Sequence, residues 1–255
     1  MQIQKVNLIY FKDKKSLNGN FGDELSIFIT EHLIDKNKYE LVINKNNIPL
    51  NIVCIGSYIH CAKNNAYIFG SGIRIPNIGN ELKYIKLNVC SVRGPLSRDI
   101  LMKKNIDVPE IYGDPALLLP KFYKPVLIDN LKDKIGVVPH KSNYVKYVNN
   151  IDTTNFYLIN PMDKWENVIN YIYSCKEIIS SSLHGLICSD AYDIPNVWLD
   201  EYKLQEGDFK FKDYFASQKR DYVKIENINE HNSLLLYRDG NKIDLDILLK
   251  IFPFS

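Results

Sequence analysis

Short apolar runs alternate with amphipathic stretches through the first half of the chain. Residues 6–11 form a β-rich apolar run, and the following stretch 20–33 places Leu25, Phe28 and Leu33 on one helical face. Further apolar runs of strand length occupy residues 52–56, 66–70 and 87–92. A regular succession of strands and helices indicates a parallel sheet covered by helices.

The second half of the chain repeats this pattern after a connector, residues 120–130, that is rich in proline and polar residues. Strands are predicted at 134–139, 154–159, 177–180 and 196–199. A helix is predicted over 163–174, with Asp163 as N-cap and with Val168, Ile169 and Ile172 on its buried face. Residues 243–252 predict a terminal helix.

We therefore predict an α/β protein with two Rossmann-like lobes, each built on a parallel sheet, and a cleft between them. The first lobe is expected to span residues 1–122. The second is expected to span residues 130–255, including the helical tail.

Composition narrows the class of partner. The 32 basic and 30 acidic residues among 255 are interspersed and give a formal charge of +2, so no basic surface indicates nucleic acid. No apolar run reaches 18 residues, and the N-terminus lacks a signal-peptide pattern, so a cytoplasmic location is expected. The five cysteines show neither C-x-x-C nor zinc-ligand spacing, and we expect buried thiols, no metal and no cofactor.

The distribution of arginine residues indicates the kind of ligand more specifically than the net charge does. Only five of the 32 basic residues are arginine, and Arg74, Arg93 and Arg98 fall within one short window. A guanidinium fork binds carboxylate and phosphate groups better than lysine does, so this cluster indicates a small polyanionic ligand. Chance clustering and ordinary salt bridges are the alternative.

The segment Ile178-Ile-Ser-Ser-Ser-Leu-His-Gly-Leu-Ile187 predicts a strand, a tight turn and a helix start. Its turn would bring His184 and the first backbone amides of the helix to one spot, around Ser182, Leu183 and Gly185. Such a spot suits an anion and a proton transfer. The alternative is that the serines cap the helix and His184 is a structural core residue.

Ligands of open α/β sheets bind beyond the carboxyl ends of the strands, so polar residues that follow each predicted strand are site candidates. After the first strand, Asn20, Asp23 and Glu24 could activate or orient a sugar hydroxyl, although an aspartate at this place also suits an N-cap. Residues 69–74 contain Ser71 and Arg74 and have the pattern of a phosphate cradle or of a plain turn.

Three further strand ends carry candidates. Arg93, fixed by Gly94 and Pro95, is expected to bind ligand, whereas Arg98 suits either a ligand or a salt bridge. Asp114 precedes a proline-initiated helix, where capping is the stronger interpretation. His140 and Lys141 follow a strand of the second lobe, and no such placement marks His32, His60 or His231.

Taken together, the chain resembles the polysaccharide pyruvyl transferase family found among exopolysaccharide and capsule gene products. The resemblance spans about residues 5 to 200 and rests on the following motifs, in this order: Asn20-Phe-Gly-Asp23, Phe69-Gly-Ser-Gly72, Val92-Arg-Gly-Pro-Leu-Ser-Arg98, Gly113-Asp-Pro115, Val138-Pro-His140 and Ser180-Ser-Ser-Leu-His-Gly185. It implies a GT-B-like fold and transfer of the pyruvyl group of phosphoenolpyruvate onto two hydroxyls of one sugar, which forms a cyclic ketal. It also implies a sugar acceptor in a bacterial surface-polysaccharide precursor. We expect this acceptor to be a lipid-linked oligosaccharide and the protein to associate peripherally with the inner face of the membrane.

The roles implied by the resemblance can be assigned to residues as hypotheses. Arg93 and the His184 turn would bind phosphoenolpyruvate, with His184 as phosphate ligand or proton donor, and Asp23 or His140 would activate the acceptor. Many relatives carry arginine where this chain has Ser182, so phosphate contacts are expected from Arg74, Lys141 or backbone amides. The acceptor is expected at Asn20, Asp23, Glu24 and Asp114.

Two other functions fit the same pattern. A GT-B-type glycosyltransferase would hold the diphosphate of a sugar nucleotide at the same strand ends. An inert member of the family would bind glycan without turnover. A donor screen by thermal shift separates the first from a pyruvyltransferase, and acceptor-dependent phosphate release separates the second.

Overall fold

The first five strands form one parallel sheet in the computed structural model, which describes residues 2–12, 19–77, 82, 86–201, 207–232 and 236–255. The order is β2-β1-β3-β4-β5. These strands are β1 (Gln4–Ile9), β2 (Tyr39–Ile43), β3 (Leu50–Val53), β4 (Ala66–Phe69) and β5 (Leu87–Ser91). The sequence pattern missed β2, an edge strand whose side chains are only partly covered.

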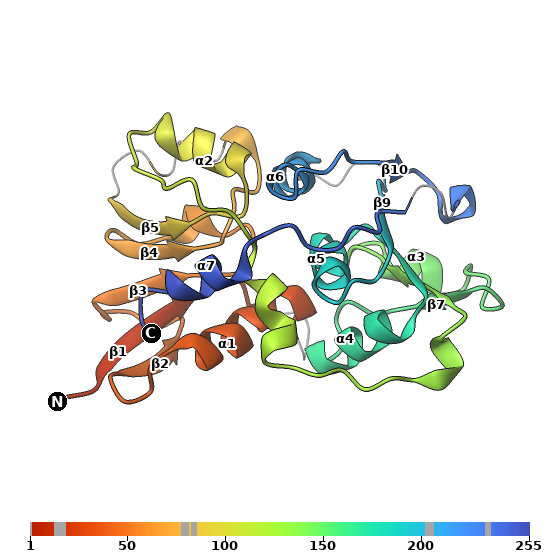
Figure 1. Ribbon diagram of the computed structural model, residues 1–255, viewed down its shortest axis with the longest axis horizontal. Coiled ribbons are helices and arrows are strands. Elements are labelled where there is room, and N and C mark those ends of the chain that lie inside the picture. The colour runs from red at the N-terminus through yellow and green to blue at the C-terminus, as the bar shows by residue number, and fades with distance from the viewer. Residues whose placement is uncertain (1, 13–18, 78–81, 83–85, 202–206, 233–235) are drawn as a thin grey trace.

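The second sheet is also parallel, with the order β10-β9-β8-β6-β7. It consists of β6 (Ile135–Val138), β7 (Phe156–Leu158), β8 (Glu177–Ser180), β9 (Asn196–Leu199) and β10 (Lys224–Ile225). β6, β8 and β9 are buried along their whole length, which explains why each carries consecutive apolar residues, although β8 begins at Glu177 and ends at Ser180 and β9 begins at Asn196. Two parallel α/β sheets confirm the predicted fold class, and Figure 1 shows them side by side.

Helices join and cover both sheets. They are α1 (Phe21–Leu33), α2 (Pro95–Met102), α3 (Tyr144–Val148), α4 (Trp165–Ser174), α5 (Leu183–Ala191), α6 (Phe209–Ser217) and α7 (Leu245–Lys250), with 3₁₀ turns η1 (Ile59–Cys61), η3 (Pro115–Lys121), η4 (Asp129–Leu131) and η5 (Ile228–Glu230). α4 begins two residues later than predicted, and its N-cap is Lys164 rather than Asp163.

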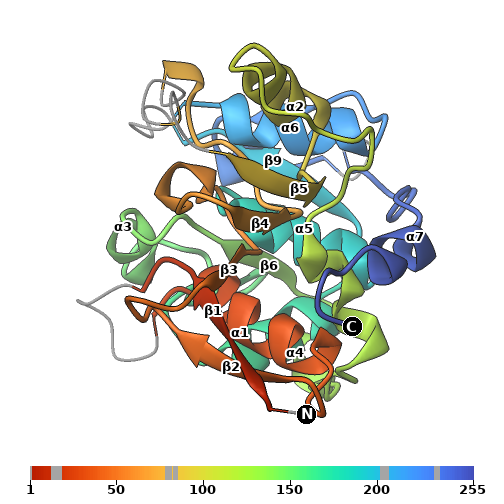
Figure 2. The same ribbon diagram turned by 90° about the vertical axis from the view of Figure 1, so that its left-hand side faces the viewer.

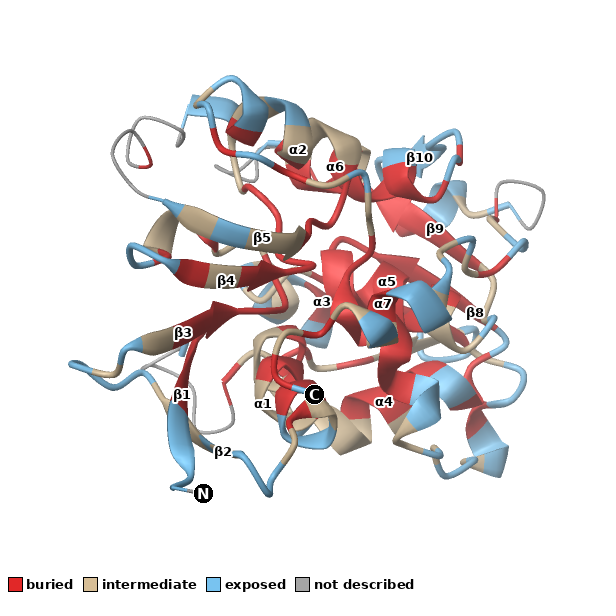
Figure 3. Ribbon diagram, turned by 60° about the vertical axis from the view of Figure 1, so that its left-hand side comes forward, coloured by how far each residue is buried: buried red, intermediate tan, exposed pale blue. Residues whose placement is uncertain are grey.

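One core runs through both halves of the molecule. η3 packs against α1 of the first half and α5 of the second, and the buried residues Leu117, Leu118 and Leu119 belong to a cluster that also includes Phe21 and Leu186. Figure 3 shows that α5 lies within the most buried part of the fold. Because this core is shared, the two sheets hold a fixed position relative to each other.

Two segments from the end of the chain lie against the first sheet. The ring of Phe254 packs on Tyr39 and Tyr67 at centroid distances of 5.3 and 4.9 Å, and Phe252 packs on Phe69 at 5.2 Å. α6 packs against α2, as Figures 1 and 2 both show. The sequence alone assigned both segments to the second lobe.

Two composition-based expectations also bear on the structure. Cys54, Cys175 and Cys188 are buried free thiols, whereas Cys61 and Cys90 are partly exposed. Within the described ranges, none of the helices is long and apolar enough to cross a membrane.

Candidate active site

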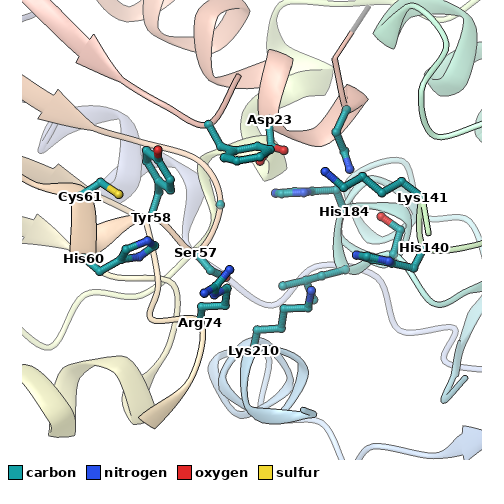
Figure 4. Close-up of a pocket in the computed structure, with 15 residues that line it drawn as sticks. Asp23, Ser57, Tyr58, His60, Cys61, Arg74, His140, Lys141, His184 and Lys210 are labelled. Atoms are coloured by element: carbon teal, nitrogen blue, oxygen red, sulfur yellow. The ribbon is translucent and has the colours of Figure 1, made fainter. Parts of the chain in front are cut away.

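A pocket of about 310 Å³ lies where strands of both sheets end. It is lined from the first half by Phe11, Asn20, Asp23, Gly56, Ser57, Tyr58, His60, Cys61 and Arg74, from the second half by His140, Lys141, Ser182, Leu183 and His184, and from α6 by Lys210. These residues follow the carboxyl ends of β1, β3, β4, β6 and β8, as expected for a ligand site of parallel sheets. Figure 4 shows the labelled side chains facing one another around the cavity.

His184 lies in the first turn of α5, packed against the start of α1. A Cβ atom at Gly22 would lie 2.1 Å from His184 Nδ1 and 2.3 Å from its Cγ, so only glycine lets the ring approach this closely. The ring of Phe21 meets the imidazole edge to face at 6.4 Å. His184 is 9% exposed, and this packing fixes the ring at the pocket wall.

Asp114 lies behind the imidazole. Its Oδ2 is 3.8 Å from His184 Nε2, and within the described part of the chain neither atom has a hydrogen-bond partner. Its Oδ1 accepts a hydrogen bond from Ala116 N at 3.0 Å and caps η3. Asp114 is fully buried and does not line the pocket, so the expectation that it binds the acceptor is corrected. One of its carboxylate oxygens caps η3, and the other faces His184 Nε2.

Asp23 supplies a carboxyl group to the same pocket that His184 lines. Burial raises the pKa of Asp23 from its usual 3.8 to about 6, against the opposing charges of His184, Lys141 and Lys210. The N-cap of α1 is Asn20, whose Oδ1 accepts from Gly22 N at 3.1 Å, so Asp23 is not needed for capping. A carboxyl with a pKa near 6 can both accept and release a proton near neutral pH.

Glu24 points away from the cavity. Its Oε1 accepts a hydrogen bond from the Tyr10 hydroxyl at 3.4 Å, and it does not line the pocket. The expectation that Glu24 contacts acceptor is therefore corrected. Adjacent residues on a helix point about 100° apart, and here the side chain of Asp23 faces the cavity whereas that of Glu24 turns toward Tyr10.

Cationic groups surround most of the cavity. Arg74, Lys141 and Lys210 line it together with His60, His140 and His184. The position of His140 is fixed by hydrogen bonds from its backbone N to Ser181 Oγ (2.7 Å) and between its Nδ1 and Ser142 Oγ (2.8 Å). Ser181 in turn donates to the buried carboxylate of Glu201. The pocket lining thus combines three basic side chains, three imidazoles and the carboxyl group of Asp23.

Arg93 does not reach the pocket, and our expectation that it binds ligand directly is corrected. Its side chain is fully buried, its Nε and Nη2 contact Asp213 Oδ2 at 3.2 and 3.1 Å, and Nη2 also donates to Ile73 O at 2.9 Å. Nη1 donates to Ser57 Oγ at 2.6 Å. Arg93 therefore holds Ser57, which lines the pocket, and ties α6 to the first sheet.

Ser71 and Gly185 also lie behind the cavity rather than in it. Ser71 Oγ donates to Gly56 O at 2.9 Å and accepts from Tyr58 N at 3.3 Å, so it shapes the loop that carries Ser57 and Tyr58. Gly185 N donates to Ser182 O, and a Cβ atom on Gly185 would lie 2.2 Å from Ser180 Oγ. Their expected contacts with the donor are corrected to structural roles.

Arg98 is also explained by local structure, since its Nε donates to Val108 O at 3.1 Å. Its salt-bridge alternative thus gives way to a backbone hydrogen bond.

An aromatic wall at the first-lobe end of the pocket was not predicted from the sequence. Phe11 and Tyr58 meet edge to face at 6.1 Å, and Tyr58 and His60 do so at 5.2 Å. His60 had been set aside, although it lies a few residues after the β3 run and that position was the available signal. Lys210 was missed as well, and no motif or strand end marks it.

Ligand sets for a metal are absent from the described residues: no three His, Cys, Asp or Glu side chains gather in a way that could hold an ion.

Comparison with known proteins matches a family model described as polysaccharide pyruvyl transferase to residues 14–201. A protein of Acanthamoeba polyphaga mimivirus, itself uncharacterized, is 28% identical over 246 residues. That similarity covers 90% of this chain and 83% of the viral protein. Of the pocket residues, Phe11 and Lys210 fall outside the segment matched by the family model.

Proposed function

The chain belongs to the polysaccharide pyruvyl transferase family, and we propose that it transfers the pyruvyl group of phosphoenolpyruvate onto two hydroxyls of one sugar. The product is a cyclic ketal on a precursor of a bacterial surface polysaccharide. The family implies a pyruvyl donor and a polysaccharide acceptor. The identity of the donor and the ketal linkage are our proposal.

The charge of the pocket carries this proposal. The described lining contains three lysine or arginine side chains, which are Arg74, Lys141 and Lys210. It contains one aspartate or glutamate, which is Asp23. A phosphate monoester carries up to about two negative charges and a carboxylate carries one, so phosphoenolpyruvate matches this excess of positive charge. A cavity of about 310 Å³ is also within the range typical of small-molecule sites.

We place the donor at the cationic end of the pocket. Arg74 can bind a carboxylate or phosphate through two parallel hydrogen bonds, and Lys141 and His140 add donors from the second lobe. Ser182 and Leu183 lie at the start of α5 and complete this wall. These residues supply the phosphate contacts that an arginine at position 182 would otherwise make.

We place the acceptor sugar against Phe11, Tyr58 and His60. Aromatic rings present large, rigid apolar faces, and the C–H faces of a pyranose can pack on them. In this position the sugar hydroxyls would lie toward Asn20 and Asp23, which line the same pocket. The acceptor would then lie against the first lobe, and the donor would lie between Arg74 of the first lobe and His140 and Lys141 of the second.

The proposed reaction forms two C–O bonds at C2 of phosphoenolpyruvate and breaks its bond to the phosphate oxygen. One hydroxyl proton ends on C3, which becomes the methyl group, and the other leaves with inorganic phosphate. Asp23 is our candidate for accepting a hydroxyl proton, because its raised pKa keeps it basic near neutral pH. His184 is the candidate for protonating C3, and the Asp114 carboxylate faces its Nε2 at 3.8 Å.

The test is a transfer assay with phosphoenolpyruvate and candidate oligosaccharides, free and lipid-linked. Mass spectrometry should detect the pyruvyl increment, and phosphate release should depend on the acceptor. His184→Ala should abolish both signals, whereas His231→Ala, which removes an ion-pair partner of Glu177 outside the pocket, should retain them. Turnover with sugar nucleotides in place of phosphoenolpyruvate would falsify the proposal in favour of a glycosyltransferase.

The setting of the reaction is part of the same proposal. A lipid-linked acceptor would bring the protein to the inner face of the membrane as a peripheral enzyme, and the chemistry needs no cofactor besides the donor. Preference for lipid-linked over free oligosaccharide in the assay above would support this setting.

A further inference from the structure

Lys210 enters the pocket from a part of the chain that the family match does not include. The matched segment ends at residue 201, and Lys210 is the second residue of α6. It is 7% exposed and lines the same cavity as Arg74 and Lys141. In Figure 4 it reaches the cavity from the side of α6 and faces the space below His140 and His184.

The position of α6 is set by a buried ion pair one turn further along the helix. Asp213 Oδ1 accepts from Ser97 N at 2.8 Å, and Asp213 Oδ2 contacts the Arg93 guanidinium and accepts from Ser97 Oγ at 2.6 Å. A Cβ atom at Gly94 would lie 1.9 Å from Asp213 O, so this contact requires glycine there.

The same helix is also anchored to the second lobe. The ring of Phe211 stacks on Trp198 of β9 at a centroid distance of 4.7 Å and an interplanar angle of 15°. α6 therefore bridges the two lobes. Residues 210 and 213 are three apart on this helix and lie on one side of it, so the contacts of Asp213 also fix the direction of Lys210.

Among the described residues that line the pocket, Asp23 is the only aspartate or glutamate, whereas Arg74, Lys141 and Lys210 are all basic. The charges of Lys141 and Lys210 both act on Asp23 and oppose the rise of its pKa. Basic side chains therefore outnumber acidic ones in this lining, and such a lining favours an anionic ligand.

We propose that Lys210 is an anion ligand of the pocket that binds the phosphate of the donor, and that Asp213 and Arg93 act as positioning residues for it. The identity of the anion as phosphoenolpyruvate rests on the proposed function. The presence of an anion site at Lys210 does not, because inorganic phosphate carries the same group.

Binding by the full chain tests the ligand role. Dissociation constants for phosphoenolpyruvate, inorganic phosphate and pyruvate would be measured for the wild type, Lys210→Met, Lys210→Arg and Lys212→Met. Lys212 is the matched control, since it lies on the same helix but pairs with Asp208 and does not line the pocket. We expect Lys210→Met to weaken phosphoenolpyruvate and phosphate binding by roughly 10- to 100-fold, Lys210→Arg to weaken it less, and Lys212→Met to leave it unchanged.

The positioning role is tested by a double-mutant cycle. Ser97→Ala removes the hydroxyl that donates to Asp213 and accepts from Ile73 N, and Asp213→Asn removes the charge. If these residues act through Lys210, each lowers donor affinity in the wild-type background but has no further effect beside Lys210→Met. Equal losses of donor affinity in both backgrounds would show that these residues act independently of Lys210 and would overturn the positioning role.

The outcomes separate this inference from the proposed function. If the wild type binds phosphoenolpyruvate and Lys210→Met binds it with the same affinity, the ligand role is overturned. The proposed function then still stands. Phosphate binding that depends on Lys210, without binding of phosphoenolpyruvate, supports the anion site and overturns the proposed donor. Absence of wild-type binding to all three probes overturns both.

Discussion

Replacing Asp23 by asparagine should make the protein more stable and less active. The pKa of Asp23 rises to about 6 in the folded protein because burial disfavours its charge. The unfolded chain has the usual value of 3.8. Between these values the folded state binds more protons than the unfolded state, so the free energy of unfolding falls as the pH rises from about 4 to 6.

The magnitude follows from the difference between the two pKa values. One pKa unit corresponds to about 1.36 kcal/mol, so the ionised carboxylate destabilises the folded protein at pH 7 by at most about 3 kcal/mol. Asparagine has nearly the same shape and no charge. Asp23→Asn should therefore raise the free energy of unfolding at pH 7 by up to about 3 kcal/mol, and this gain should disappear toward pH 4.

Denaturant unfolding at pH 7 and pH 4 measures this difference, and the transfer assay measures the accompanying loss of activity. Asp213→Asn is the matched control, since it removes a buried carboxylate that is paired with Arg93. It should lower stability at pH 7, by about 3–5 kcal/mol, because it leaves a guanidinium buried without its counter-charge. If Asp23→Asn is destabilising at pH 7, or if its effect does not change with pH, the electrostatic account of Asp23 is wrong.

Three further predictions concern residues in or directly behind the pocket, and Gly136→Ala serves as a control for the first of them. Gly22→Ala should lower kcat by roughly 100-fold, because the new Cβ would lie 2.1 Å from His184 Nδ1 and the ring would have to move by about 1 Å. Gly136→Ala, which crowds Ile178 in the second sheet, should reduce Tm but retain kcat. Asp114→Asn should lower kcat by roughly 10- to 100-fold without loss of the η3 cap, since asparagine also caps helices. Tyr58→Ala should raise the KM for the acceptor by roughly 3- to 10-fold and leave the KM for the donor unchanged.

Each of these has a result that contradicts it. Full activity of the Gly22 variant would mean that the close approach to His184 has no role in turnover, and a Tm decrease without a change in kcat for the Asp114 variant would assign that residue to folding alone. A matching rise in both KM values for the Tyr58 variant would place the aromatic wall between the two substrates rather than on the acceptor side.

The sequence was sufficient for most of the architecture because the relevant signals are local. Buried parallel strands such as β6 and β8 carry consecutive apolar residues, and a strand followed by a tight turn and a helix places His184 at a strand end without further information. Asp23, Arg74 and Lys141 were found by the same rule, and the structure brings all of them to one pocket. The edge strand β2 was missed because its residues are half-buried and give no clear pattern.

The direction of each candidate side chain depended instead on partners far away in the chain. Arg93 follows its strand at the expected place, but its guanidinium pairs with Asp213, which lies 120 residues later in the chain. Asp114 was a capping residue as well as a site candidate, and only the packing of η3 against α5 brings it to His184. Lys210 carries no sequence signal, since nothing local indicates that α6 crosses to the first sheet.

The amino-acid sequence by itself determined which segments become strands, which ends of those strands carry polar groups, and that the second lobe presents His184 at a helix start. Only the tertiary structure decided which of those polar groups face the cavity, which stand behind it, and that a lysine from α6 joins them. The physical reason is range: hydrophobic periodicity and turn chemistry act over a few residues, whereas a buried charge is satisfied by whichever partner the completed fold brings within hydrogen-bond distance.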